Sequence, residues 1–548
     1  MTARIHHFFA PVAALLITLS ISAQEEQTDP MLARFAVQMT SAKHDFNIGN
    51  LRGALTGFRE VLDEVPGAAR VELWIARCHL GLRREDLAIA YLDSVMAHDV
   101  DLAQTELKLR GEILHRLARY EEAIDVLVQY LDFGKPDAID EAQARHWITE
   151  CRRAWAATDD LAAHPSDLRF EHMGGAINSR FDEYAPAWSP DGQAIAFTSR
   201  RDGGLNPEID ESGDHQFYSD IYISRKSSSE PGGWTRASLL PGAINTMGFD
   251  AILSWPVAAG GGEILVYRNN NFLAGDICKS TRAEDGTWTD AEPIERPVNS
   301  SYFEGSASIS ADGEFLYFIS ERPEGLGHGD IFRSTKKSFG WSTPEPLGAP
   351  VNTAEDEKFV HAHGDGRVIF FASKGHAGFG DYDMYRTEWV HEGWSIPVNL
   401  GMPLNGPREE STFALSADGR QLAITAERPE GFGARDIYSM DVTEHPWMGV
   451  RAGEAWAGGL EVTADLSSLP KIKGDKVRIE IWDADARSVR HGETADRNGS
   501  AFFRMPANTD FVVRVVGPKG NVLCEQSWSH EQSGPGEFLD KLTCECKE

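Results

Sequence analysis

The sequence predicts a multidomain chain with three consecutive folded parts: an α-helical solenoid, a five-bladed β-propeller and a small C-terminal β-sandwich. Three observations predict this order. A helical repeat of 34 to 35 residues comes first, a strand repeat of about 53 residues fills the middle, and alternating strands end the chain. With 548 residues, the chain is long enough for each part to bury a core of its own.

Five copies of one pattern predict the propeller, which we place at residues 167–445. Each copy has an opening Asn, an acidic residue five positions later, an apolar strand, usually a turn such as Ser310-Ala-Asp-Gly313, and a second strand that ends in a basic residue. A Gly-rich loop and a third strand such as Asp436-Ile-Tyr438 follow. The opening residues are Asn178, Asn245, Asn299, Asn352 and Asn405, and the last three steps between them are 54, 53 and 53 residues. This period, with about four short strands a unit, indicates a propeller rather than a sandwich or a βαβ fold.

The propeller also has a predicted closure. Four copies continue into an outer strand that we expect to begin at Trp234, Trp288, Trp341 and Trp394, whereas the fifth copy lacks this strand. The segment 171–178 aligns with 345–352 and ends in the same Asn. We therefore expect this N-terminal strand to complete the last blade, with a divergent sixth blade as the alternative to five.

Helical repeats are predicted over residues 31–157. Ala54, Ala88 and Ala123 recur at steps of 34 and 35, and Phe58, Leu92 and Leu127 each follow four residues later. This is the tetratricopeptide (TPR) spacing, in which a small residue lets paired helices approach closely. We expect three repeats and a capping helix over 139–157; a helical bundle with accidental spacing is the alternative.

The two ends of the chain carry further signals. Arg4, the apolar run 11–21 and the small pair Ser22-Ala23 predict a signal peptide over residues 1–23, with a retained membrane anchor as the alternative. Alternating strands such as 477–482 and 511–516 predict a sandwich over 455–548. In an exported chain, we expect a disulfide between Cys524 and either Cys544 or Cys546. Cys78, Cys151 and Cys278 are expected to be buried as small apolar residues.

Charged residues recur at two positions of the strand repeat. Propeller topology brings both positions to one face, called the top face, where they are expected to meet near one rim of the central channel. The acidic set is Glu183, Asp250, Glu304, Glu357 and Glu410, and the basic set is Arg200, Arg268, Arg322, Lys374 and Arg428. Two interpretations are open: recognition of a charged ligand, or salt bridges that join the blades. Repetition in all five copies favours the salt bridges.

Two breaks in the repeat are candidate binding features. The first copy has a long acidic loop in which Asp210, Ser212 and Asp214 alternate as in a calcium loop, although the later ligands of that loop are missing. In the fourth copy, His361 and His363 lie on one side of the innermost strand, and His361 replaces a small residue that lines the channel elsewhere. A third metal ligand is not visible, so a hydrogen-bonded histidine pair is favoured and no metal or cofactor is predicted.

The turns Trp188-Ser-Pro-Asp-Gly192, Ser310-Ala-Asp-Gly313 and Ser416-Ala-Asp-Gly419 resemble the PD40 (WD40-like, TolB-type) propeller family. The order of the three parts resembles exported envelope proteins of Bacteroidota. One of those proteins belongs to the type IX secretion apparatus and ends in an OmpA-like peptidoglycan-binding domain, for which this sequence shows no counterpart. The last part is similar to carboxypeptidase-regulatory-like sandwiches at Thr494-Ala-Asp-Arg-Asn-Gly499 and Phe502-Phe503.

These features predict a non-catalytic scaffold of the bacterial envelope, linked to secretion or outer-membrane assembly. Protein partners would bind in the TPR groove and on the propeller top face, in the periplasm or peripherally at the outer membrane. The net charge of −31 argues against nucleic acid, and no transmembrane segment is expected in the mature chain. No Gly-x-Ser-x-Gly or His-Glu-x-x-His motif is present. The alternative is a propeller enzyme or carbohydrate-binding protein that acts on envelope or extracellular glycans, with its site at the top-face channel mouth around His361 and the acidic residues.

Overall fold

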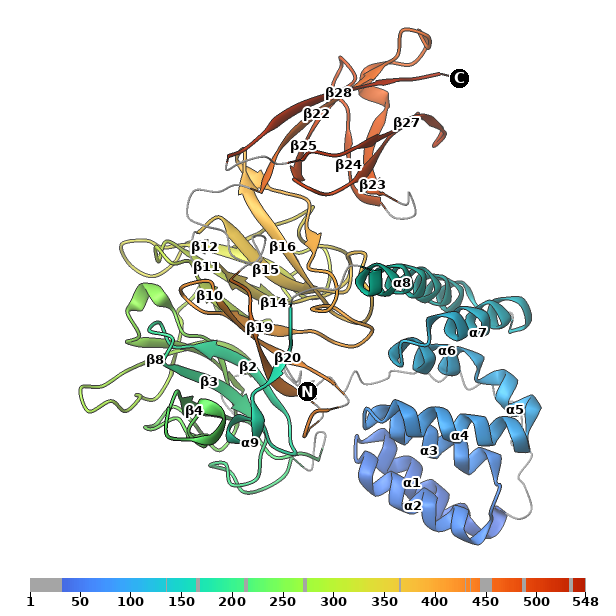
Figure 1. Cartoon of the computed structure of the whole chain (residues 1–548), viewed down its shortest axis with the longest axis vertical. Coiled ribbons are helices and arrows are strands. Elements are labelled where there is room, and N and C mark those ends of the chain that lie inside the picture. The colour runs from blue at the N-terminus through green and yellow to red at the C-terminus, as the bar shows by residue number, and fades with distance from the viewer. Residues whose placement is uncertain are drawn as a thin grey trace.

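A helical region is followed by a large β-sheet-rich region in the computed structural model (Figure 1). The structure describes residues 32–134, 136–163, 168–210, 215–269, 274–363, 366–428, 430–433, 435–443, 456–484, 489–531 and 536–547. The predicted signal peptide lies outside these ranges. Within them, no helix combines the length and the apolar character needed to span a bilayer.

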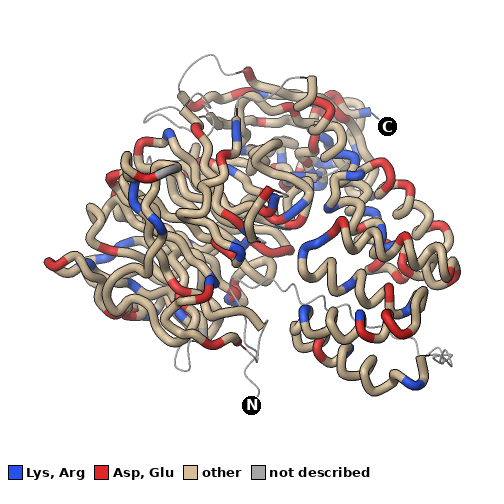
Figure 2. Tube along the Cα trace, turned by 60° about the horizontal axis from the view of Figure 1, so that its bottom comes forward, with Lys and Arg blue, Asp and Glu red and all other residues tan. Residues whose placement is uncertain are grey.

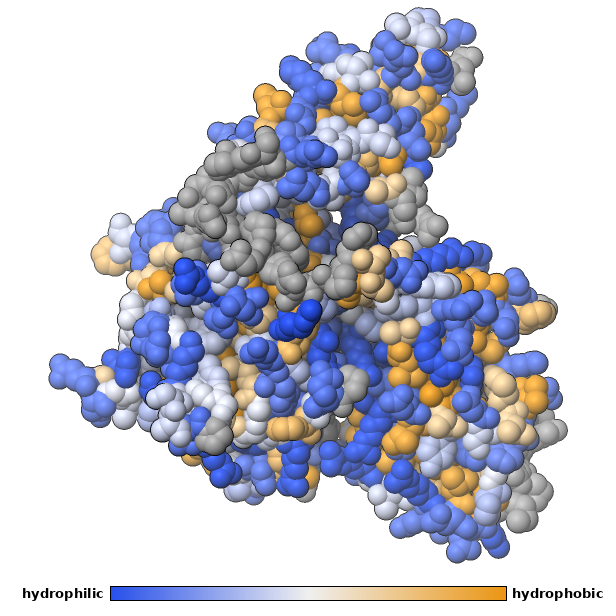
Figure 3. Space-filling model, viewed as in Figure 1, coloured by the Kyte–Doolittle hydropathy of each residue, from blue (hydrophilic) through white to orange (hydrophobic). Residues whose placement is uncertain are grey.

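The helical region consists of TPR-like antiparallel helix pairs. Ala54, Ala88 and Ala123 are fully buried, which is why the paired helices can approach closely. The helices are η1 (Ala33–Phe35), α1 (Ala36–Asn47), α2 (Leu51–Glu64), α3 (Ala69–Gly81), α4 (Glu85–His98), α5 (Val100–Thr105), α6 (Leu107–Arg116), α7 (Tyr120–Phe133) and α8 (Ala138–Ala163). Two details differ from the sequence expectation: α8 is longer than the predicted capping helix, and the short α5 interrupts the repeat. Apolar patches remain visible over these helices (Figure 3).

Five antiparallel sheets follow, and we call residues 171–441 the five-sheet region. The first sheet contains β2 (Glu183–Trp188), β3 (Ala194–Ser199), β4 (Asp220–Arg225) and β5 (Ser238–Leu239), and the second contains β6 (Phe249–Ser254), β7 (Glu263–Asn269), β8 (Ala274–Thr281) and β9 (Glu292–Pro293). The third sheet contains β10 (Glu304–Ile309), β11 (Phe315–Ser320), β12 (Asp330–Thr335) and β13 (Glu345–Pro346). The fourth sheet contains β14 (Glu357–Ala362), β15 (Val368–Ser373), β16 (Asp383–Val390), β17 (Gly393–Trp394) and β18 (Val398–Asn399). The fifth sheet joins β19 (Thr412–Leu415), β20 (Gln421–Ala426) and β21 (Asp436–Asp441) to β1 (Glu171–His172), and the short α9 (Gly174–Ile177) follows β1.

The first strands of the five sheets contact one another in sequence. β2 contacts β6, β6 contacts β10, β10 contacts β14, β14 contacts β19, and β19 contacts β2 again. The expected N-terminal strand is present, because Glu171 and His172 of β1 pair with Ser439 and Tyr438 of β21. The last sheet is thus completed from the other end of its own region.

The outer strands differ from the sequence expectation. They begin about four residues after the tryptophans and span only two residues each, at β5, β9, β13 and β18. The tryptophans instead form isolated bridges or a short hairpin with the end of the third strand, as Trp234 does with Lys226. Their rings pack against neighbouring sheets: Trp394 of the fourth sheet and Tyr317 of the third sheet have ring centroids 5.9 Å apart. Their repetition therefore reflects packing between sheets rather than strand starts.

The repeated opening asparagines join neighbouring sheets. Asn352 accepts a hydrogen bond from the Ile331 N–H (3.1 Å) through Oδ1 and donates one to the Ile331 carbonyl (3.1 Å) through Nδ2. The same amide-to-backbone pair occurs between Asn178 and Ile437, Asn245 and Ile221, Asn299 and Ile277, and Asn405 and Met384. An amide carries a donor and an acceptor side by side, so it replaces a missing strand partner.

The C-terminal region contains two sheets around a shared core. One joins β22 (Ala457–Asp465), β25 (Ser500–Pro506) and β28 (Leu539–Glu545); the other joins β23 (Arg478–Asp483), β24 (Val489–Thr494), β26 (Phe511–Val516) and β27 (Val522–Trp528). Their buried side chains form one apolar cluster. Cys524 is disulfide-bonded to Cys546, one of the two expected partners, while Cys544 is a buried free thiol. Cys78, Cys151 and Cys278 are buried, as expected.

Candidate functional site

The five recurring carboxylates lie at or beside the start of the innermost strands and are buried. Each accepts a hydrogen bond from the backbone N–H four residues earlier, on Ser179, Thr246, Ser300, Thr353 or Gly406. The structure therefore directs Glu183, Asp250, Glu304, Glu357 and Glu410 into the loops that lead into their own strands. Ligand binding by these carboxylates stays a prediction.

The regular ring of ion pairs is formed at only two of the five positions. Arg268 pairs with Asp250 (Nε–Oδ1 2.9 Å), and Arg322 pairs with Glu304 (Nη2–Oε1 3.1 Å). The other three basic residues have different partners. Arg200 donates a hydrogen bond to the Phe217 carbonyl, and the neighbouring Arg201 pairs with Glu183 instead. Lys374 pairs with Asp381, whereas Arg428 donates to the Pro403 carbonyl and lies over the Phe170 ring. The basic residue begins a loop that differs between the copies, so its side chain takes the nearest acceptor that loop provides.

Glu357 is one of the three carboxylates whose predicted cation has another partner, since Lys374 pairs with Asp381. Its carboxyl accepts from the Thr353 N–H and from the hydroxyls of Thr353 and Ser373. Burial raises the pKa of Glu357 to about 8. The folded protein therefore keeps this carboxyl protonated at neutral pH, where an unfolded chain has ionised it.

Stability is expected to fall as the pH rises from about 4.5 towards 8, because the folded pKa of Glu357 lies above its unfolded value. The contribution is complete below the unfolded pKa, and a tenfold change in proton affinity corresponds to about 1.4 kcal/mol. Glu357→Gln, which keeps the shape of the protonated acid, should flatten this part of a plot of melting temperature against pH. Glu304→Gln is the control, since it breaks an ion pair and should destabilise at every pH. An unchanged slope in Glu357→Gln would contradict this assignment.

A cavity of about 150 Å³ lies at the other end of the innermost strands. Its lining includes the apolar residues Leu253, Trp255, Val257 and Phe413; the polar lining residues are Ser189, Ser254, Ser308, His361, His363 and Ser416. His361 follows Glu357 by four residues on β14, so about 13 Å of strand separates them. The expectation that His361 and the acidic residues share the top-face channel mouth is therefore wrong. His361 lies at the opposite end of the innermost strands from the five carboxylates.

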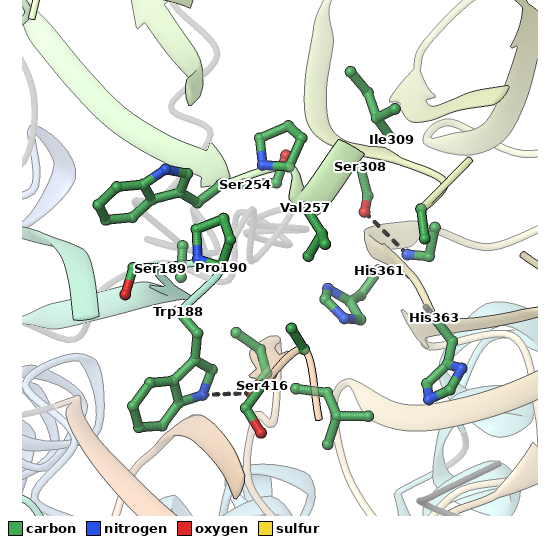
Figure 4. A pocket seen from close by; sticks show the side chains of 18 of the residues that line it. Trp188, Ser189, Pro190, Ser254, Val257, Ser308, Ile309, His361, His363 and Ser416 are labelled. Carbon is green, nitrogen blue, oxygen red and sulfur yellow. Dashed lines mark hydrogen bonds between the residues drawn. The ribbon is translucent and has the colours of Figure 1, made fainter. Parts of the chain in front are cut away.

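Two polar groups in this cavity have no hydrogen-bond partner among the residues that the structure describes. The Ser254 hydroxyl is buried without a partner, and the His361 imidazole points towards the middle of the cavity, whereas His363 points away (Figure 4). Burial, with His363 nearby, lowers the pKa of His361 to about 3, so the ring is neutral at neutral pH. The lining residues include no Asp, Glu, Lys or Arg. The cavity is suited to a neutral ligand with both apolar surface and hydroxyl groups.

Sequence reasoning missed the second copy's contribution to this cavity. The first, third and fifth copies turn through Ser-x-Asp-Gly between their first two strands, but here the turn is Trp255-Pro-Val-Ala-Ala-Gly-Gly-Gly262. It forms the short helix η3 (Val257–Ala259), from which Val257 reaches over the cavity (Figure 4). The break in the repeat was visible in the sequence as this missing motif.

Among the described residues, no group of three His, Cys, Asp or Glu side chains is arranged to hold a metal ion. Ser212 and Asp214 of the calcium-like loop lie outside the described residues. Asp210 is described and buried.

Solved structures resemble separate parts of the chain. The TPR domain of P58(IPK) is 20% identical and covers 24% of this chain, with a TM-score of 0.21; the chain spans 36% of that structure. The Yersinia enterocolitica secretion chaperone SycD, solved with a peptide of the translocator YopD, is 16% identical over 22% of this chain and 92% of its own (TM-score 0.20). An α-L-arabinofuranosidase from Lactobacillus brevis is 14% identical over 49% of this chain and 92% of its own (TM-score 0.31). No protein-family model and no curated protein matches the chain.

These comparisons correct two expectations. The β-rich region is matched by several glycoside hydrolases, each over about half of the chain. The prediction of a non-catalytic scaffold is contradicted by this finding, and so is the prediction that the protein is not an enzyme. The enzyme or carbohydrate-binding alternative is the better-supported reading, while the helical region is TPR-like as expected.

Proposed function

We propose that the five-sheet region is a five-bladed β-propeller that recognises glycans, with a neutral sugar unit bound in the cavity around Ser254 and His361. The observation that carries this proposal is an uncharged cavity in which a buried hydroxyl and a neutral imidazole have no partner within the described part of the chain. The closed sequence of contacts between the five first strands supports the propeller.

The chemistry of the lining matches the two sides of a sugar ring. The apolar C–H face of a sugar packs against side chains such as Val257 and Phe413, and its hydroxyls can exchange hydrogen bonds with Ser254 and His361. Burying a hydroxyl without a hydrogen-bond partner costs free energy. A ligand that forms a hydrogen bond with the Ser254 hydroxyl recovers this cost when it binds. A cavity of roughly 150 Å³ holds one benzene-sized ring, which limits the site to a single unit of a glycan.

Glycan binding should weaken about tenfold in Ser254→Ala and in His361→Ala, since a hydrogen bond of about 1.4 kcal/mol corresponds to that factor. The measurement is a glycan-array screen of the full chain, followed by calorimetric titration of the best ligand. His363→Ala is the matched control, because His363 directly follows the same strand and lines the cavity, while its imidazole points away from the middle (Figure 4). Equal losses in all three variants, or no glycan bound by the wild-type protein, would refute the proposal.

The same preparations test for turnover. Glycoside hydrolysis in most families needs two carboxyl groups beside the scissile bond, and the cavity lining contributes neither. Release of reducing sugar from bound glycans would therefore direct the search for the acid pair to residues outside this lining.

We further propose the finer organisation that the sequence predicts: TPR repeats over 31–157, the propeller over 167–445 and a carboxypeptidase-regulatory-like sandwich over 455–548. The two packed C-terminal sheets support the sandwich. The helical region would take a protein partner, as SycD does with its peptide. Export to the periplasm or outer membrane, as in the PD40 proteins of Bacteroidota, rests on the signal at residues 1–23. A secreted chain that begins near Gln24 would support it, and retention in the cytoplasm would count against it.

A further inference from the structure

One turn of the helical region carries an arginine where its backbone favours glycine. The turns between the paired helices reach positive φ at Gly49 (85°), Arg83 (56°) and Ala118 (56°), which are equivalent positions of the three repeats. A left-handed conformation costs an L-residue roughly 1–2 kcal/mol, and glycine avoids this cost. An arginine at this position therefore needs a compensating contact.

Arg83 finds that contact in the five-sheet region. Its guanidinium pairs with Glu409 (Nη2–Oε2 3.6 Å) and with Glu427, and both carboxylates are almost completely buried. Glu409 also binds Lys358, next to the start of β14. Asp182, which precedes β2, pairs with Arg435 at 2.7 Å.

Asp182, Arg435 and Arg116 also act electrostatically on Arg83. The charged groups around Arg83 thus flank strands of the first and fifth sheets, lie in β14 of the fourth sheet (Lys358), or end α6 (Arg116). Charged positions gather where the helices face the sheets (Figure 2). The Arg83 turn thus lies at the end of the ring where the five recurring carboxylates lie at or beside the start of the innermost strands, which we call the acidic end. The cavity lies at the opposite end.

Side chains of α4, α6 and α8 complete the contact with loops of the five-sheet region. His115 Nε2 lies 2.7 Å from the Phe379 carbonyl oxygen, and Arg153 donates to the Gly378 carbonyl at 2.9 Å. Arg408 pairs with Glu85 at 3.3 Å. Phe379 packs into the apolar core of the helical region. Met402 also packs against this core, and the other contacts named here are polar.

We propose that Glu409 and Glu427 form a guanidinium-binding site that Arg83 fills in cis, and that the helical region is thereby a removable cap on the acidic end of the ring. Removing the guanidinium leaves the buried Glu427 without an ion-pair partner among the described residues, while Glu409 keeps Lys358. Loss of the guanidinium should therefore open the cap rather than merely loosen it. This inference does not depend on what the cavity binds.

Small-angle X-ray scattering of the full chain tests the cap. Arg83→Gly removes the guanidinium and relieves the backbone, and it should raise the radius of gyration. Ala118→Gly makes the same backbone change at the equivalent turn, where the side chain is exposed, and should leave the radius at the wild-type value. An unchanged radius in Arg83→Gly would overturn the proposal.

A second variant approaches the site from the sheet side. Glu427→Gln keeps the shape of the side chain and leaves the helical region untouched. It therefore tests the cap even if circular dichroism shows that Arg83→Gly has lost helix content. It should raise the radius as well, and the double variant should add nothing to Arg83→Gly, since both act on one pair. Additive effects of the two changes would show that they do not share a site.

Discussion

Replacing Arg322 with methionine is expected to destabilise the five-sheet region by about 3–5 kcal/mol. The guanidinium bonds to the carboxylate of Glu304, which is completely buried, and to the Val298 carbonyl. Methionine keeps much of the volume but leaves Glu304 in the interior without its cation. A urea titration followed by tryptophan fluorescence measures the loss.

Lys374→Met is the matched control for Arg322→Met, because Lys374 holds the same repeat position in the fourth sheet. Its partner is the partly exposed Asp381 rather than the buried carboxylate. Pairs of this kind contribute about 0–1 kcal/mol, so the expected loss is small. Adding Glu304→Gln to Arg322→Met should recover part of the stability by removing the buried charge. Equal losses in Arg322→Met and Lys374→Met would contradict the distinction drawn between the two positions.

Asn352→Ala is expected to cost about 2–4 kcal/mol, because it leaves the N–H and the carbonyl of Ile331 without partners at a buried position. The effect should appear as a lower melting temperature by calorimetry. Asn245→Ala removes the same two hydrogen bonds to Ile221, but Asn245 is only half-buried and water can take its place. A loss in Asn245→Ala as large as in Asn352→Ala would show that burial does not set the cost.

Local and repeated features could be predicted from the sequence. Buried Ala54, Ala88 and Ala123 produce a spacing that any stack of close helix pairs requires, and the copy at 171–178 reveals the strand that completes the fifth sheet. The sequence also predicted that Cys524 forms a disulfide with either Cys544 or Cys546, and the structure has the bond to Cys546. The acidic positions were predictable because each carboxylate bonds a backbone N–H only four residues away.

Which carboxylate each basic residue pairs with could not be predicted, because these ion pairs depend on the paths of the loops. Arg201 rather than Arg200 reaches Glu183, and Lys374 reaches Asp381, since the loops after the second strands differ between copies. The cavity escaped prediction for a related reason. It combines residues from all five first strands, and its polar members Ser254 and His361 come from copies that are distant in the sequence.

The sequence by itself determined the repeats, the order of helices and sheets, and the residues that each repeat buries, because these depend on spacing along the chain. Only the tertiary structure decided which end of the innermost strands holds His361, which arginine pairs with which carboxylate, and that Arg83 of a helical turn meets Glu409, just before β19. The physical reason is that burial and charge pairing act over distances in space. Residues hundreds of positions apart become neighbours only when the helical region lies across the sheets.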